Sequence, residues 1–277
     1  MIRPSLADYG THGESAFPRY WDRVLRAWSP VLGQTGGRVY DFSRNSRWGL
    51  TTGIDLATQW GTFRGNTGLS HDGVDDWVDF GSNDFSGTDF SIVSWFRVLT
   101  AVIHFPYSTS NATGASGVEL LYGVGGNLGQ IASRIAGSAT AQLAHDFGSS
   151  ANALADAICF VQTFSDSQTT KAHGIFVNGA NAQTTTYTSN TAPSQNWSWA
   201  KRGTFFVSGT GSTVQWFEQM VFRGIITANE AAEIYQLGPG GLYQRRKRRY
   251  SIAAEEAPAF RAPWATRSRS IIGGGIR

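Results

Sequence analysis

The stretch Phe90-Ser91-Ile92-Val93-Ser94-Trp95-Phe96 decides the fold class of this chain. Successive side chains of a β-strand point to opposite faces of the sheet, and here both sets are largely apolar. A strand of this kind is buried on both faces, as in the centre of a covered sheet. Ile158-Cys159-Phe160-Val161-Gln162-Thr163-Phe164 has the same character. The two segments therefore predict a sheet whose central strands are covered on both sides.

Turn and cap signals lie outside these central strands. The segment His173–Gly179 ends in Asn-Gly, the strongest short hairpin signal, and predicts a return strand over Ala182–Thr188. Thr227 and Glu230 form a capping box, which predicts a short helix over Ala228–Leu237.

The segment 100–155 carries the weakest strand signals, so the sequence leaves open whether this segment forms a separate lobe.

A further strand is predicted over Val214–Phe222. Its apolar residues at even spacing are expected to share one face, because side chains alternate along a strand. These residues are Val214, Trp216, Met220 and Phe222. Glu218 interrupts that face.

The composition supports an all-β protein. The 277 residues include 33 glycines, 17 phenylalanines and 10 tryptophans, and only 16% are charged. Many glycines and aromatics suit short strands joined by tight turns. Cys159 is the single cysteine, so no intrachain disulfide forms and the fold depends on its core. The first residues lack the apolar run of a signal peptide, and no stretch approaches the about 18 apolar residues of a membrane span.

Charge and proline–glycine content divide the chain into three regions. Residues 1–26 are predicted to be an extended arm, 27–238 the β domain, and 239–277 a basic arm with little packed core. The segment from Leu242 to the end has nine basic and two acidic residues. Its net charge is +7, which leaves about −4 on the rest of the chain.

Several segments, in order, resemble laminin-G-like (concanavalin A-like) jelly rolls. Leu69-Ser70-His71-Asp72-Gly73-Val74-Asp75-Asp76-Trp77-Val78-Asp79-Phe80 resembles a strand pair of that family. Further similar segments follow in the family's order, and the resemblance covers roughly residues 28–237. They are Phe90–Val98, Ala157–Phe164, Gly174–Gly179 and Phe217–Tyr235. The resemblance implies an all-β, two-sheet antiparallel jelly-roll sandwich with terminal arms and one short C-terminal helix.

The flanking segments resemble those of phage-encoded and environmental proteins with this jelly roll. The similar segments are Ala27–Gly36, Asp41–Leu50, Asp55–Trp60 and the arginine-tyrosine stretch Arg245–Tyr250. This resemblance implies a virion structural protein, either a capsid decoration (cement) protein or another surface subunit, assembled in a host cytoplasm. A homo-oligomer in the assembly and contacts with other virion proteins, such as a major capsid protein, are then expected.

The basic run is the predicted docking segment of such a subunit. It comprises Arg245, Arg246, Lys247, Arg248, Arg249 and Tyr250. The run could be a solvated tail, a nucleic-acid contact through phosphate charge, or a contact with an acidic protein surface. Aromatic residues are too sparse in it for a single-strand stacking platform, which disfavours nucleic acid. No membrane partner is expected.

The search for enzymatic chemistry predicts a non-enzymatic protein. A glycan hydrolase needs two carboxylates about 5–9 Å apart. The strand over Val214–Phe222 offers Glu218 alone, and Ile158–Phe164 offers none. A hydrolase therefore ranks last among the hypotheses.

Two clusters are candidates for binding. Trp197 and Trp199 occur in a polar segment and would point the same way on a strand, so they are candidates for stacking on a glycan. The alternative is that both rings pack over the rim of the sandwich or on a neighbouring subunit. Asp72, Asp75, Asp76 and Asp79 could together hold Ca²⁺, which takes oxygen ligands. We favour the alternative without a metal, in which the Asp and Gly residues serve the turn.

Overall fold

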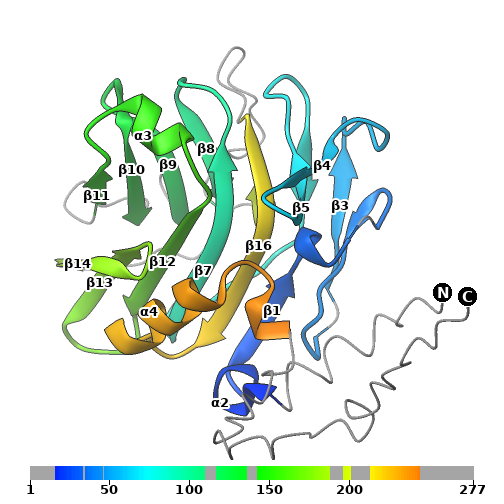
Figure 1. Ribbon diagram of the computed structural model, residues 1–277. Helices are drawn as coiled ribbons and strands as arrows, with labels where there is room; N and C mark the ends of the chain where they lie inside the picture. The colour runs from blue at the N-terminus through cyan, green and yellow to red at the C-terminus, as the bar shows by residue number, and fades with distance from the viewer. Residues whose placement is uncertain are drawn as a thin grey trace, which may run out of the picture. The chain divides into compact units, whose positions relative to one another are not determined.

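The computed structural model describes residues 16–33, 35–45, 47–109, 117–135, 142–187, 196–200 and 213–243 (Figure 1). The chain divides into two units, residues 1–245 and 246–277, and the described residues all belong to the first. They form two antiparallel sheets and three short α-helices. The predicted all-β, two-sheet sandwich is confirmed.

The first sheet, here called sheet A, has the strand order β14-β13-β12-β7-β16-β5-β4, with β1 also paired to β16. Its strands are β1 (Val24–Trp28), β4 (Trp60–Phe63), β5 (Asn66–Ser70), β7 (Asp89–Val98), β12 (Ile158–Ser165), β13 (Lys171–Val177), β14 (Ala180–Tyr187) and β16 (Val214–Arg223).

The second sheet, sheet B, has the order β11-β10-β9-β8-β15-β6-β3-β2. Its strands are β2 (Arg38–Val39), β3 (Gly49–Thr52), β6 (Trp77–Asp79), β8 (His104–Ser108), β9 (Val118–Val124), β10 (Asn127–Ile135), β11 (Gln142–Asp146) and β15 (Ser198–Trp199). The segment 100–155 thus supplies β8 to β11 of sheet B and is no separate lobe.

The helices are α2 (Pro18–Trp21), α3 (Ser150–Leu154) and α4 (Ala228–Leu237), with 3-10 turns η1 (Pro30–Leu32) and η2 (Gly241–Tyr243). The capping box of Thr227 and Glu230 begins α4, as predicted. The predicted hairpin also forms, because Asn178 and Gly179 both adopt positive φ, at 52° and 75°. None of the helices in the described ranges is long and apolar enough to cross a membrane.

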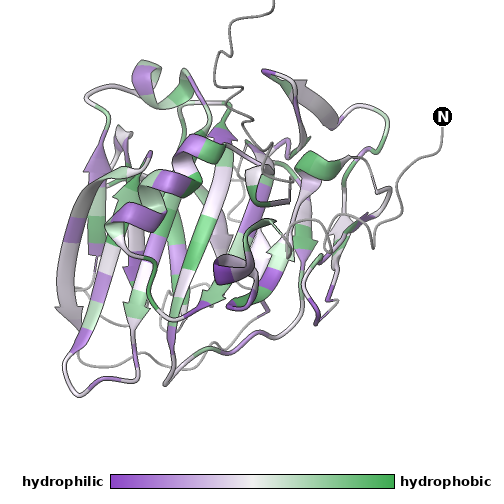
Figure 2. Ribbon diagram, turned by 60° about the horizontal axis from the view of Figure 1, so that its bottom comes forward, coloured by the Kyte–Doolittle hydropathy of each residue, from purple (hydrophilic) through white to green (hydrophobic). Residues whose placement is uncertain are grey.

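Strands β7, β12 and β16 are buried on both faces, as the apolar runs predicted. One set of side chains faces sheet B, for example Ile92, Phe96 and Phe160. The other set forms a second, outer core under α2, α4 and η2. Figure 1 shows α4 lying across these strands, and Figure 2 shows hydrophilic and hydrophobic residues in alternation along it.

A β-bulge in β16 corrects the predicted face of that strand. The register shifts between Trp216 and Glu218, so Phe217 is an extra residue relative to β7. An extra residue exchanges the two faces beyond it. Val214 and Trp216 consequently face the core between the sheets, whereas Met220 and Phe222 face the outer core.

The roots of both predicted arms belong to the sandwich, which corrects the boundaries at 26 and 239. Strand β1 pairs with β16, and Tyr20 and Trp21 are buried in the outer core. The Trp21 indole donates a hydrogen bond to the carbonyl of Leu242, at 2.9 Å. Tyr243 packs edge-on against Trp21, with ring centroids 5.2 Å apart. The uncovered face of sheet A explains both corrections, because these segments bury it.

Glu218 is the buried acid of the outer core. It is 2% exposed and accepts a hydrogen bond from the backbone N–H of Gly240. Burial raises the pKa of Glu218 to about 7, although the Gly240 N–H lowers it. Folding therefore takes up a proton at this site between the unfolded and folded pKa values.

We predict that Glu218→Gln removes a pH-dependent destabilisation. The folded pKa lies above the usual 4.5, so the stability of the wild type declines as the pH rises from about 4.5 to 7. The shift corresponds to about 3 kcal/mol. Urea denaturation across this pH range should show the free energy of unfolding of the variant rising relative to that of the wild type by this amount. Equal pH dependence of both proteins would contradict the assignment, and the exposed Asp22→Asn is the control.

Candidate functional site

Trp197 and Trp199 lie in the core, not on the surface. They are 1% and 0% exposed, and both indole N–H groups donate to Oε1 of Gln219, at 2.9 and 2.7 Å. The amide of Gln219 in turn donates to Ser94 Oγ at 3.1 Å. Trp197 directly precedes β15 and Trp199 ends it, so their spacing places both rings on the same side, but that side faces inward. The hypothesis that these rings stack on a glycan is therefore wrong, because stacking needs an exposed ring face.

Among the tryptophans in the described ranges, Trp48 is the exposed one: it directly precedes β3 and is 46% exposed. The guanidinium of Arg38 lies 4.9 Å from the centroid of its ring. This cation–π contact orients the indole while leaving much of it in water. Tryptophan is enriched at binding interfaces, because its ring is apolar while its N–H can stay in water.

Trp48 forms one wall of an open cleft of about 490 Å³ at the end of the β3–β6 pair. This volume lies in the usual range for small-molecule sites. The cleft is lined by Arg47, Trp48, Leu50, Asp79, Phe80, Gly81 and Asn196. Leu50 and Asp79 are direct partners in the register of β3 and β6, so they project from adjacent strands. We refer to this site as the Trp48 cleft.

Hydrogen bonds within the chain orient the polar groups of the cleft. Asp79 accepts hydrogen bonds from the Gly81 N–H at 2.7 Å and from the Asn196 side-chain amide at 3.0 Å. The Arg47 guanidinium donates to the carbonyl of Ser82 at 2.9 Å. These bonds fix a carboxylate, an amide and a guanidinium around one opening, so little ordering remains to be done when a ligand binds.

Buried groups hold the backbone beside Trp48. The N–H of Arg47 donates to Asp41 Oδ2 at 2.9 Å, and its carbonyl accepts the indole N–H of Trp28 at 2.7 Å. Asp41 also accepts from the N–H groups of Ala27 and Ser43, at 2.9 and 2.8 Å. The position of the exposed indole thus depends on the core.

Solved structures share this fold at low sequence identity. The binding domain of botulinum neurotoxin serotype D matches with a TM-score of 0.56 at 13% identity, over 79% of this chain and 52% of that chain. The binding domain of Paraclostridial Mosquitocidal Protein 1 matches with a TM-score of 0.57 at 10% identity, over 78% and 52%. Trypanosoma rangeli sialidase in complex with sialic acid matches with a TM-score of 0.53 at 14% identity, over 77% and 33%.

These likenesses show the β-sandwich fold alone. This chain spans about half the length of the toxin binding domains and a third of the sialidase. No protein-family model and no curated protein sequence matches the chain. The laminin-G-like resemblance agrees with the fold, and its phage context has no counterpart among these structures.

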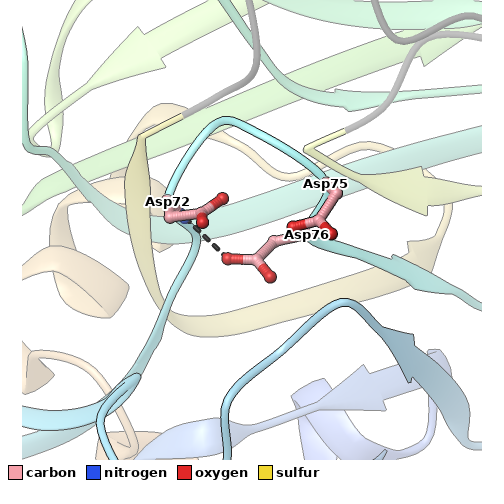
Figure 3. Close-up of side chains that lie close together, drawn as sticks. All are labelled: Asp72, Asp75 and Asp76. Atoms are coloured by element: carbon pink, nitrogen blue, oxygen red, sulfur yellow. Dashed lines mark hydrogen bonds between the residues drawn. The ribbon is translucent and has the colours of Figure 1, made fainter.

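The other predicted sites have different outcomes. Asp72, Asp75 and Asp76 lie close together (Figure 3), whereas the fourth predicted residue, Asp79, lines the Trp48 cleft. The docking segment Arg245–Tyr250 lies outside the described residues. Sequence reasoning missed Trp48, which follows Arg47 and directly precedes β3, since nothing in the sequence separates an exposed tryptophan from a buried one.

We predict that Trp199→Ala lowers the free energy of unfolding by about 3–5 kcal/mol, because it leaves a cavity in the core and removes one donor to Gln219. Trp48→Ala, the matched control, should change it by less than about 0.5 kcal/mol. Guanidinium denaturation followed by circular dichroism measures both. Similar small effects of the two substitutions would contradict the burial of Trp199.

Proposed function

We propose that this protein is a non-enzymatic glycan-binding module and that the Trp48 cleft is its sugar site. The observation that carries the proposal is the half-exposed Trp48 indole beside Asp79 and Asn196 in an open cleft. Carbohydrate ligands combine flat apolar C–H faces with many hydroxyl groups. The cleft offers a partner for both kinds of surface.

Each group has a distinct part in binding. The indole of Trp48 packs on the apolar face of a sugar ring. Asp79 accepts hydrogen bonds from sugar hydroxyls, and the Asn196 amide and the Arg47 guanidinium complete the polar contacts. Leu50, which is 52% exposed, extends the apolar wall. The open form of the cleft suits an extended or branched glycan better than an enclosed small molecule.

The same cleft supports binding without hydrolysis. Asp79 is the single carboxylate among the residues that line it. Cleavage of a glycosidic bond by the usual mechanism requires an acid and a second carboxylate about 5–9 Å apart. The cleft contains one of the two groups, so we assign it to recognition.

We predict that a glycan array probed with the full chain identifies at least one ligand and that Trp48→Ala weakens its binding about tenfold or more. Loss of one stacking contact of about 1.4 kcal/mol accounts for that factor. Leu56→Ala is the control, since Leu56 is 43% exposed and lies outside the cleft lining. Unchanged affinity of Trp48→Ala, or the absence of any glycan ligand, would refute the proposal.

A virion location remains a prediction that rests on the sequence, and a surface subunit could also carry the glycan site. A truncation that tests docking through the C-terminal segment must keep residues 241–243, because they are buried. Removal of residues 244–277 should leave a folded, soluble domain that no longer joins particles, as measured by co-sedimentation. Normal incorporation of this truncated chain would contradict docking through Arg245–Tyr250.

A further inference from the structure

After α4 the chain turns back over the outer core as a short segment, residues 238–243, here called the C-terminal strap. Its backbone bends on both sides of Pro239, because Gly238 and Gly240 adopt positive φ, at 73° and 74°. A Cβ on Gly240 would lie only 2.8 Å from Cγ1 of Val31. Glycine at this position therefore lets the strap lie close against η1.

Two hydrogen bonds hold the strap on the sandwich. The Gly240 N–H donates to the carboxylate of Glu218 on β16, and the Trp21 indole donates to the carbonyl of Leu242 at 2.9 Å. The ring of Tyr243 packs on that of Trp21. Glu218 thus ties the strap to the centre of sheet A, and Trp21 ties it to α2.

Glu218 has no protein counter-ion. Within the described ranges, no lysine, arginine or histidine forms an ion pair with it. The titratable groups that face it are Cys159 on β12 and Tyr243 in the strap. Burial, and then the nearby Glu218 carboxylate, raise the pKa of both groups, so both stay neutral at neutral pH. Asp41, which lies near Tyr243, is an acid and supplies no positive charge.

The charged side chains of α2 and α4 pair with one another. Arg23 forms an ion pair with Glu230 at 3.0 Å, and Arg19 forms one with Glu233. The side chains that α2, α4 and β7 bury in the outer core are aliphatic or aromatic. An ionised Glu218 beneath a closed strap is therefore costly, because it keeps the Gly240 N–H but lacks a cation and water.

We propose that Glu218 is a pH-sensitive switch that controls local opening of the C-terminal strap. While the carboxyl group is protonated, the strap stays closed over it. When the group ionises, the strap opens so that water reaches the charge, and the two sheets stay assembled. The predicted docking segment Arg245–Tyr250 follows the strap directly, so opening increases its reach.

Opening becomes more favourable as the pH rises. Burial raises the pKa of Glu218 to about 7 in the closed form, whereas a hydrated glutamate beside an open strap returns to its usual pKa of about 4.5. The closed form therefore holds the proton more tightly. Its advantage is complete below about pH 4.5 and is lost as the pH rises to about 7, above which opening no longer depends on this group.

Local opening is distinct from the global unfolding that Glu218→Gln tests above, and it is independent of the Trp48 cleft. Global unfolding exposes both cores, whereas opening of the strap exposes the part of the outer core beneath it. A domain whose stability depends on pH could still keep its strap closed until all of it unfolds. The switch and the glycan site can therefore fail their tests separately.

Two indole N–H groups report on the strap and on the sheets separately. That of Trp21 is bonded to Leu242 of the strap, whereas that of Trp199 is bonded to Gln219 between the sheets. The test follows hydrogen–deuterium exchange of both indoles and of the Gly240 amide by NMR. It uses the full chain at about pH 5 and about pH 7, without urea and with low concentrations of urea.

At about pH 7 the Trp21 indole should exchange about tenfold or more faster than the Trp199 indole. Low urea should leave the Trp21 rate unchanged, because local opening exposes little surface, and should raise the Trp199 rate, which requires global unfolding. Equal rates with equal urea dependence would show that the strap opens only with the whole domain, which would overturn the proposal.

Glu218→Gln is the decisive variant, because it keeps an acceptor for the Gly240 N–H but cannot ionise. The rate of Gly240 exchange in the wild type, divided by the rate in the variant at the same pH, should rise about tenfold or more from about pH 5 to about pH 7. Intrinsic exchange rates cancel in this ratio.

Asp22→Asn is the matched control, since Asp22 is an exposed carboxylate next to Trp21. The corresponding ratio for this variant should be the same at both pH values. A constant ratio for Glu218→Gln, or an equal rise for Asp22→Asn, would refute the assignment of the switch to Glu218.

Discussion

The two sheets are joined by a layer of aromatic rings, two of which donate their indole N–H groups to one acceptor. Gln219 Oε1 receives the indole N–H groups of both Trp197 and Trp199. Trp199 stacks on Trp216 with ring centroids 4.6 Å apart, and Trp197 stacks on Tyr107 with ring centroids 5.4 Å apart. A buried indole N–H without a partner is costly, so this shared acceptor stabilises the burial of Trp197 and Trp199.

The aromatic layer also supports the surface where binding is proposed. Phe80 lines the Trp48 cleft and packs on Trp28 and Trp199. The centroid of its ring lies 4.2 Å from that of Trp28 and 4.7 Å from that of Trp199. Trp28 holds the backbone next to Trp48 through the carbonyl of Arg47. A rigid core thus positions an exposed indole, which is how a binding site limits the ordering cost of its ligand.

Local sequence patterns predicted the strands, the hairpin and the helix well, but they did not predict which side chains face the core. Two-sided apolar runs, Asn178-Gly179 and the Thr227 capping box act over a few residues, and each forms as expected. Spacing alone could not reveal the extra residue Phe217, which exchanges the faces of β16. Nor could it tell whether the shared side of Trp197 and Trp199 points in or out. The segments 16–26 and 239–243 pack on the sandwich because they cover one face of sheet A, and that uncovered face exists only once the strands are assembled.

The central claim is that burial assigns the tryptophans their roles, with Trp197 and Trp199 holding the sheets together and Trp48 meeting the ligand. Indole N–H resonances in a nitrogen-15 NMR spectrum report on each ring separately. The account predicts that a bound glycan shifts the Trp48 resonance, while the Trp197 and Trp199 resonances stay in place and exchange slowly with deuterium. Shifts at Trp197 or Trp199 with an unmoved Trp48, or rapid exchange at the two core indoles, would contradict it.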